Sequence, residues 1–344
     1  MAPSQYSRYV LNERPGRGPV NPRTFRKETL PFELNPGKGE ILVQVLYLSL
    51  DPANRTWLND ARNYMEPVKI GETMRAGALG RVVKVGEGVT KFVPGDLVNG
   101  TMGWTEYIVV PAKGYQKIVI PPGAELIDFL GPLGMNGLTA YFGLFNVGQI
   151  KSGETLVVSA AAGATGSLVC QLGKMVGAKV IAIAGADDKC HWLETELGVD
   201  KAINYKSPTF HADFKKAVGY FDVYFDNVGG EILNFALTRM KKHARIAFCG
   251  SISDYNAVPK GLTNYMNLIS QSAKLEGFIV FDYASQYASA QKDLTKWVSE
   301  GKLKRKFHLV QGLDNASEAL GLLFNGGNTG KLVVQVAPVD NAKL

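Results

Sequence analysis

The chain has 344 residues, 46% hydrophobic and 20% charged, the balance of a globular protein long enough for two domains with separate cores. Lysine and arginine outnumber aspartate and glutamate by 38 to 31, and the resulting net charge of +7 favours anionic ligands. The basic residues are dispersed except within residues 302–306, and the strongly apolar stretch 41–50 is too short for a membrane span. Neither nucleic acid nor a membrane is therefore expected as a partner.

Cysteine is rare, which limits both the redox environment and any metal site. Cys170, Cys190 and Cys249 are far apart in sequence, and there are only four histidines. This set is too small for a disulfide framework or a four-cysteine zinc site. We expect a reducing, cytoplasmic location and no metal.

The first third of the chain has the pattern of short strands. Residues 40–50, 81–85 and 105–110 are rich in β-branched and apolar side chains, and turn signals such as VGEG and VPGD separate the runs. Strands at this spacing predict a small, mostly β domain over residues 1–129.

From residue 130 to 296, apolar runs alternate with helical segments. Strands are expected at 155–160, 179–185, 201–205, 221–228, 244–252 and 274–280, with helices at 166–176, 188–197, 210–218 and 231–240. This alternation predicts an α/β fold with a doubly wound parallel sheet, that is, a Rossmann domain. Residues 297–344 return to strand–helix–strand and are expected to complete the first domain.

The stretch after the first of these strands keeps two of the three glycines of a dinucleotide-binding turn. The pattern G-x-G-x-x-G is here Ala161-x-Gly163-x-x-Gly166. The second glycine lets the backbone approach the pyrophosphate, and the third lets the helix pack closely on the strand. Alanine can replace the first glycine if its φ stays negative. The alternative is a plain strand–helix connection, but the position at the start of a βαβ series favours dinucleotide binding.

The end of the second strand indicates which dinucleotide binds. NAD sites usually hold an Asp or Glu there, on the ribose 2′-hydroxyl, whereas this chain has Ala184 and Gly185. Asp187 and Asp188 come later and have the pattern of helix N-caps. Lys189 follows in the first helical turn, where its ammonium either reaches a 2′-phosphate or is a solvated surface group. The small residues favour NADP(H).

Several motifs resemble a known superfamily. VGEGVTKFVPGDLV (residues 85–98) and the turn resemble the medium-chain dehydrogenases/reductases, which implies a GroES-like domain over 1–129 completed by 297–344, and a Rossmann domain over 130–296. All the cysteines lie in the Rossmann half, so the zinc ligands of the alcohol dehydrogenases are missing. LSLDPANR, GMNGLTAY, AAAGATGS, INYK, FDNVGG, CGSISDYN and NTGKLVV resemble the zinc-free leukotriene B4 12-hydroxydehydrogenase, prostaglandin reductase and alkenal double-bond reductase family.

The resemblance implies NADPH as cofactor, a homodimer, and a set of cofactor contacts. Lys189 and Tyr205 would meet the 2′-phosphate, residues 164–167 would line the pyrophosphate, and Asn328 would close the site. The full implied set is Gly163, Ala164, Thr165, Gly166, Ser167, Lys189, Tyr205, Asn227, Cys249, Ser251, Tyr255, Phe278, Val280 and Asn328.

The implied substrate pocket contains two departures from the family. The family motif DPYMR is here DPANR, with Ala53 and Asn54, and the proline of GMPGLTAY is Asn136. Met135 and Tyr255 complete the expected pocket. With Ala53 in place of a tyrosine, we expect a roomier pocket that accepts bulky or aromatic ketones.

The implied reaction is reduction of the carbon–carbon double bond of an enone or enal by hydride transfer to the β-carbon. Negative charge develops on the carbonyl oxygen, so a hydrogen-bond donor there lowers the barrier. Tyr255 of ISDYN is the candidate donor, or else only a wall of the pocket. A quinone reductase of the same superfamily and a non-catalytic NADPH-binding sensor are the alternative functions.

Overall fold

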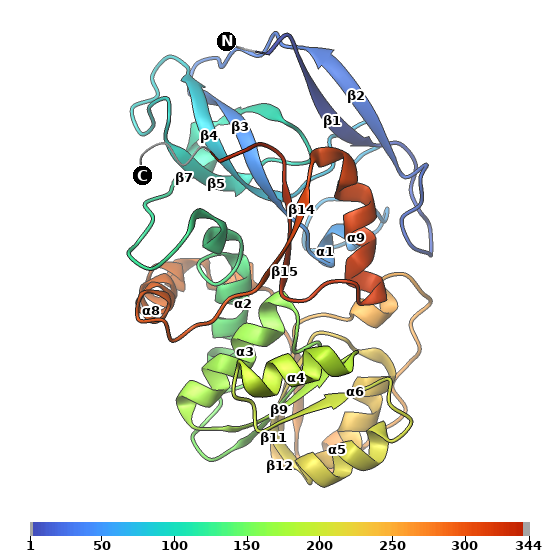
Figure 1. Ribbon diagram of the computed structural model, residues 1–344. Helices are drawn as coiled ribbons and strands as arrows, with labels where there is room; N and C mark the ends of the chain where they lie inside the picture. Colours follow the sequence, from blue (N-terminus) through green and yellow to red (C-terminus); the bar gives the residue numbers. More distant parts are fainter. Residues whose placement is uncertain (1–2, 340–344) are drawn as a thin grey trace. The chain divides into compact units, whose positions relative to one another are not determined.

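The computed structural model describes residues 3–339, which form two compact units (Figure 1). One unit contains the described residues up to Leu130, Phe307–Gly327 and those from Leu332 onward. The other contains Gly131–Lys306 and Asn328–Lys331. The domain boundaries expected from the sequence, after residues 129 and 296, stay a prediction.

The first unit is built around a mostly antiparallel sheet. Within residues 3–339, this sheet has seven strands, with the order β14-β15-β3-β4-β5-β7 and with β6 also paired to β3. The strands of the unit are β1 (Gln5–Leu11), β2 (Phe25–Pro31), β3 (Glu40–Ser49), β4 (Gly77–Val85), β5 (Leu97–Thr101), β6 (Tyr107–Pro111), β7 (Gln116–Lys117), β14 (Phe307–Gln311) and β15 (Lys331–Gln335). Its helices are α1 (Ala53–Thr56) and α9 (Ala316–Asn325), with 3₁₀ segments at Ala112–Gly114, Leu126–Leu130 and Leu313–Asn315.

Strand β3 explains the apolar run near residue 45. It pairs with β4, β6 and β15, so most of its side chains are buried. Val333 of β15 lies opposite Ser49 of β3, so the C-terminal strand, red in Figure 1, joins the sheet that contains the blue strand β3. The strands predicted at 40–50, 81–85 and 105–110 are confirmed as β3, β4 and β6.

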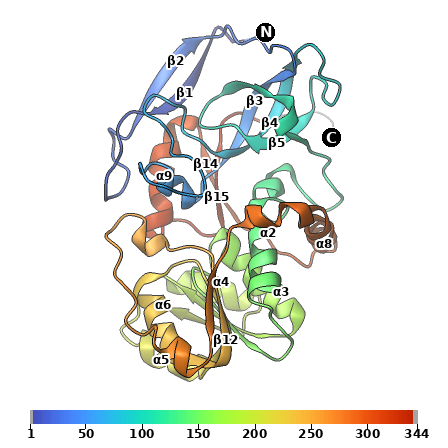
Figure 2. The ribbon, with the colours of Figure 1, turned by 180° about the vertical axis from the view of Figure 1, so that it is seen from behind.

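The second unit is the predicted doubly wound sheet. In the described chain it has six strands, all parallel, in the order β10-β9-β8-β11-β12-β13. The strands are β8 (Thr155–Val158), β9 (Lys179–Ala184), β10 (Lys201–Asn204), β11 (Phe221–Asp226), β12 (Met240–Phe248) and β13 (Lys274–Gly277). The helices are α2 (Met135–Phe142), α3 (Ala164–Val176), α4 (Asp187–Thr195), α5 (Phe210–Val218), α6 (Gly230–Ala236), α7 (Asn267–Ser270) and α8 (Tyr287–Ser299). A π-helical segment, Gly143–Val147, follows α2, and 3₁₀ segments occupy Leu237–Arg239, Ile252–Asp254 and Val280–Gln286. Both views show α3 to α6 packed around this sheet (Figure 2).

Two predicted elements end elsewhere. The helix expected over 231–240 ends at Ala236, and Met240 already belongs to β12, where it is buried opposite Phe221 of β11. The pairing of β12 with β11 is irregular between Met240 and Arg245, where His243 takes a positive φ of 65°. The polar residues of this irregular stretch do not show the apolar pattern of a strand. The last strand ends at Gly277, so the prediction that Phe278 and Val280 lie in it is wrong.

The chain order of the sheet locates a crevice for ligands. After β8 the chain builds β9 and β10 on one side, and then returns to β11 on the other side of β8. In parallel sheets, ligands bind at the carboxyl ends of the strands where the order reverses in this way. The carboxyl ends of β8 and β11 therefore mark the expected site. No helix among residues 3–339 is both long and apolar enough to cross a membrane.

Candidate cofactor site

The turn after β8 presents free backbone donors at the start of α3. The helix begins at Ala164, earlier than the expected Gly166, with Gly163 as its N-cap. Its first helical hydrogen bond runs from the Ser167 N–H to the Gly163 carbonyl (3.0 Å). The N–H groups of Ala164, Thr165 and Gly166 precede this bond, at the positive end of the helix dipole. This arrangement binds an anionic group such as a pyrophosphate.

The two glycines of this turn have different surroundings. A Cβ atom on Gly166 would lie 2.4 Å from the Ala160 carbonyl oxygen, so only glycine fits there without a backbone shift. A Cβ atom on Gly163 would meet the same oxygen at 3.2 Å. The left-handed conformation falls on Ala160, with φ of 46°, and Ala161 keeps out of that region. Alanine at position 161 is therefore compatible with the turn, as predicted.

Strands β8 and β11 are tied together at their carboxyl ends. Asp226 is fully buried, and its carboxylate accepts hydrogen bonds from Ser159 Oγ (2.7 Å) and from the N–H groups of Val228 (3.1 Å) and Gly229 (3.0 Å). Burial raises the pKa of Asp226 to about 6, against the opposing effect of these hydrogen bonds. The side-chain amide of Asn227 donates to the Ser159 carbonyl (2.7 Å), and its backbone N–H donates to Ser159 Oγ (2.8 Å). Asn227 is therefore held in one orientation at the crevice.

The loop after β12 packs on the turn that contains Asn227. The Cys249 N–H donates to the Asp226 carbonyl (2.8 Å), and Ser253 Oγ donates to the Val228 carbonyl (2.6 Å). Tyr255 Oη accepts the Ser251 N–H (3.2 Å), so the phenol lies against the loop backbone. The structure thus brings Asn227, Cys249, Ser251 and Tyr255 together at one edge of the sheet.

Cys249 is a half-buried residue whose thiol is shielded from solvent. Burial, together with the nearby charge of Asp226, raises the pKa of Cys249 to about 12. The thiol is therefore protonated at neutral pH and is a poor nucleophile.

Lys189 and Tyr205 lie at the carboxyl ends of β9 and β10. The Tyr205 N–H donates to the Ala184 carbonyl (2.9 Å), and the Tyr205 ring lies over Gly185, where a Cβ atom would meet it at 2.8 Å. Lys189 Nζ donates to the Asn328 carbonyl (2.7 Å). Burial is the main reason that the pKa of Lys189 is lowered; the Asp188 carboxylate opposes this shift, and nearby Lys206 adds to it.

Asn328 belongs to a short segment that lies against the turn before α3. Gly330 N–H donates to the Ala162 carbonyl (2.8 Å), and the Asn328 side-chain amide donates to the Gly330 carbonyl (3.1 Å). The structure therefore joins Lys189, Asn328 and the turn, and the role of these residues in cofactor binding stays a prediction. Asp187 and Asp188, in contrast, are not N-caps: Ala186 holds that position, and both acids lie in the first turn of α4.

The remaining predicted residues are less closely grouped. Asn136 Nδ2 donates to Thr165 Oγ1 (3.3 Å), which links α2 to the start of α3, and Met135 beside it is exposed. Phe278 packs on Phe225, with ring centroids 6.2 Å apart, whereas the Val280 carbonyl accepts the Tyr287 hydroxyl (2.9 Å).

Ala53 and Asn54 belong to the first unit and open α1. Asn54 is only 1% exposed, and its Oδ1 accepts the Asp51 N–H (2.8 Å), a local bond that holds the turn before the helix. Ala53 is half-buried. The substrate pocket predicted from Ala53, Asn54, Met135, Asn136 and Tyr255 stays a prediction.

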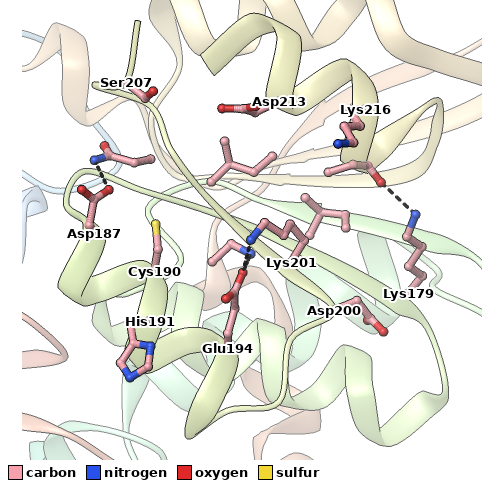
Figure 3. A pocket seen from close by; sticks show the side chains of 15 residues that line it. Lys179, Asp187, Cys190, His191, Glu194, Asp200, Lys201, Ser207, Asp213 and Lys216 are labelled. Carbon is pink, nitrogen blue, oxygen red and sulfur yellow. Dashed lines mark hydrogen bonds and ion pairs between the residues drawn. The ribbon is translucent and has the colours of Figure 1, made fainter. Parts of the chain in front are cut away.

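A groove over the outer strands of the sheet is not this site (Figure 3). It runs along β9, β10, α4 and α5, and none of the predicted site residues lines it. Its charged groups are largely satisfied: Lys201 pairs with Glu194 (2.8 Å), and Lys179 Nζ donates to the Ala217 carbonyl (2.8 Å). Among residues 3–339, no cluster of three or more His, Cys, Asp or Glu side chains could hold a metal ion.

The residues at the crevice fit a phosphorylated dinucleotide. The N-terminal donors of α3 and a glycine that admits no Cβ match a pyrophosphate. Lys189, near a strand end without the usual carboxylate, matches the 2′-phosphate of NADPH. The sequence analysis did not single out Lys206, which lies near Tyr205 and Lys189. Its only signal was its place beside Tyr205 in INYK.

Comparisons with known proteins identify the class. Residues 7–118 match the family model described as the N-terminal domain of oxidoreductase, and residues 164–299 match that described as zinc-binding dehydrogenase. The NADPH-dependent curcumin reductase of Escherichia coli is 37% identical, over 97% of each chain. The NADP⁺-dependent 2-alkenal reductase of Nicotiana tabacum is 38% identical, over 91% of this chain and 92% of the relative. The crystal structure of CurA from Vibrio vulnificus in complex with NADPH matches with a TM-score of 0.90 and 37% identity, over 97% of this chain and 100% of the other.

The fold and the cofactor edge are thus those of the medium-chain dehydrogenases/reductases. Within this superfamily, the chain belongs to the family of NADP-dependent alkenal, prostaglandin and curcumin reductases. It is an NADP-dependent oxidoreductase, and its cofactor is NADPH, which confirms the family and cofactor predicted from the sequence.

Proposed function

We propose that this protein reduces the carbon–carbon double bond of α,β-unsaturated ketones and aldehydes. The observation that carries the proposal is the Tyr255 hydroxyl, held against the Gly250–Ser251 backbone at the cofactor edge of the sheet. Two relatives with 37% and 38% identity are named for curcumin and 2-alkenals, and both names denote conjugated carbonyl compounds. NADPH, when bound, supplies the hydride.

The residues of this chain bind the cofactor phosphates, orient the site and stabilise the charge that develops on the substrate. The N-terminal donors of α3 and the Lys189 ammonium hold the phosphates, and the Ser159–Asp226–Asn227 network fixes the wall of the crevice. As the β-carbon gains a hydride, electron density moves to the carbonyl oxygen. The Tyr255 O–H donates a hydrogen bond to that oxygen while Oη still accepts the Ser251 N–H, and this lowers the barrier. A proton from solvent then completes the α-carbon.

The test is a substrate panel followed by loss of NADPH absorbance. A short enal, an aryl enone and a quinone are each offered with NADPH and with NADH, and the products are identified by mass spectrometry. We expect the enal and enone to be reduced to saturated carbonyl compounds, with NADPH preferred. If only the quinone reacts, the protein is a quinone reductase. If nothing reacts although NADPH binds, the sensor function stands instead.

Location and assembly belong to the same proposal. The cysteines within residues 3–339 are all free, which supports the cytoplasm as the location. We propose a homodimer, supported by the apolar side chains exposed near the β13 edge, which include Tyr265, Met266 and Ile269. Light scattering on the purified chain measures the mass, and a monomer at micromolar concentration contradicts the dimer.

A further inference from the structure

We propose that Lys206 is a specificity-determining residue whose ammonium binds the 2′-phosphate of NADPH together with Lys189. The inference rests on NADPH as cofactor and on the expected place of its 2′-phosphate, not on the proposed substrate. Neither the motifs of the sequence nor the comparisons assign this role to Lys206.

The backbone places Lys206 beside the end of β9. Asn204 of β10 lies opposite Ala184 of β9, so the residues after each strand meet at the same edge of the sheet. The Lys206 N–H donates to Asn204 Oδ1 (3.0 Å), and Asn204 Nδ2 donates to Asp187 Oδ1 (2.8 Å). These bonds fix where the Lys206 side chain starts.

The side chain then turns toward the Tyr205 ring. Lys206 Nζ lies 5.9 Å from the ring centroid, and the same ring lies over Gly185. Gly185 follows the strand end at which NAD sites hold a ribose-binding carboxylate. The ammonium of Lys206 is therefore close to the position that distinguishes NADPH from NADH.

The charges around this position favour an added anion. Lys206 is close enough to Lys189 to lower the pKa of Lys189, so the two ammonium groups repel each other, while the nearby Asp188 carboxylate acts on Lys189 in the opposite direction and more strongly. Lys189 is held by the Asn328 carbonyl, whereas Lys206 is exposed and forms no ion pair with a carboxylate among residues 3–339. A 2′-phosphate carries close to two negative charges at neutral pH. Binding it relieves this repulsion and satisfies both lysines.

The experiment compares Lys206→Gln with Lys215→Gln. Lys215 is an exposed lysine of α5, so its replacement removes the same charge from the same unit away from the cofactor edge. Dissociation constants are measured by calorimetry for NADPH, NADH and adenosine 2′,5′-bisphosphate. We expect Lys206→Gln to raise the dissociation constants of NADPH and of the bisphosphate by about tenfold, and that of NADH by less than about twofold. Lys215→Gln and the charge-retaining Lys206→Arg should remain near the original protein.

Two results would overturn the role of Lys206. One is equal weakening of NADPH and NADH, which indicates a general structural effect. The other is an NADPH affinity of Lys206→Gln that matches that of Lys215→Gln. Enone reduction by the original protein is measured separately, so a chain that fails to reduce enones but shows the discrimination keeps this inference and loses only the proposed reaction.

Discussion

A Cβ atom on Gly166 would lie 2.4 Å from the carbonyl oxygen of Ala160, far inside van der Waals contact. Ala160 itself has a positive φ of 46°, and the Ala161 N–H is bonded to the Ile183 carbonyl (2.9 Å). The turn is therefore held on both sides and cannot move away from the helix at low cost. The third glycine of the fingerprint is needed for packing.

Gly166→Ala and Gly163→Ala should separate the role of the turn in helix packing from its role in letting the cofactor approach the backbone. We expect Gly166→Ala to lower the free energy of unfolding by on the order of 1–3 kcal/mol, because the turn must shift. Gly163→Ala meets Ala160 at only 3.2 Å, so its stability should stay within about 1 kcal/mol while NADPH binds about tenfold more weakly. Urea unfolding and calorimetric titration measure the two effects. Equal stability losses in both variants would contradict this division.

Asp226 should give the protein a measurable pH dependence of stability. Its pKa is raised by burial to about 6 from 3.8, so its contribution is present at low pH and is lost as pH rises from about 4 to 6. The unfolding free energy of the original protein minus that of Asp226→Asn should therefore fall by ~1.4 kcal/mol from pH 5 to pH 7.

Urea unfolding at the two pH values, on both proteins, checks this result. The exposed carboxylate Asp60 supplies the control, because Asp60→Asn removes an acid that lies 3.9 Å from Arg14 on the surface. The control difference should be the same at both pH values. A constant difference for Asp226→Asn as well would mean that the carboxylate titrates in its ordinary range.

Local patterns predicted much of this fold. The apolar run at β3, the alternation of strands and helices after residue 130 and the position of Lys189 follow from spacing and residue type alone. Each depends on near neighbours in the chain or on a periodicity that burial imposes. The resemblance to the family then indicated which individual residues should contact the cofactor.

Long-range and individual contacts were not predictable in the same way. The Ser159–Asp226 bond joins residues from different strands, and no local pattern announces it. Lys206 has the sequence appearance of any surface lysine, and only the register of β9 and β10 brings it near Lys189. Met240 was expected at the end of a helix, whereas its pairing with Phe221 of β11 and its burial place it in a strand.

Removing the Tyr255 hydroxyl should slow the reaction without lowering the affinity for NADPH. We expect Tyr255→Phe to lower kcat for an enone by about 100-fold, because the developing negative charge loses its hydrogen-bond donor. Tyr220→Phe is the matched control, since Tyr220 is an exposed tyrosine of the same unit that has no proposed role in catalysis. Steady-state kinetics and NADPH titration measure both variants. If kcat stays within about threefold of the original, Tyr255 is only a wall of the pocket, because loss of a donor to the developing charge would lower kcat much more.

Ala53→Tyr should narrow the range of substrates. Ala53 is half-buried at the first residue of α1, and its neighbour Asn54 is fixed by the Asp51 N–H, so a larger side chain at position 53 alters the surface without rebuilding the turn. We expect the kcat/KM of a bulky aryl enone to fall about tenfold relative to that of a short enal, since the added ring occupies space that the larger substrate uses. NADPH affinity and melting temperature should not change. An unaltered ratio between the two substrates would show that Ala53 does not set selectivity.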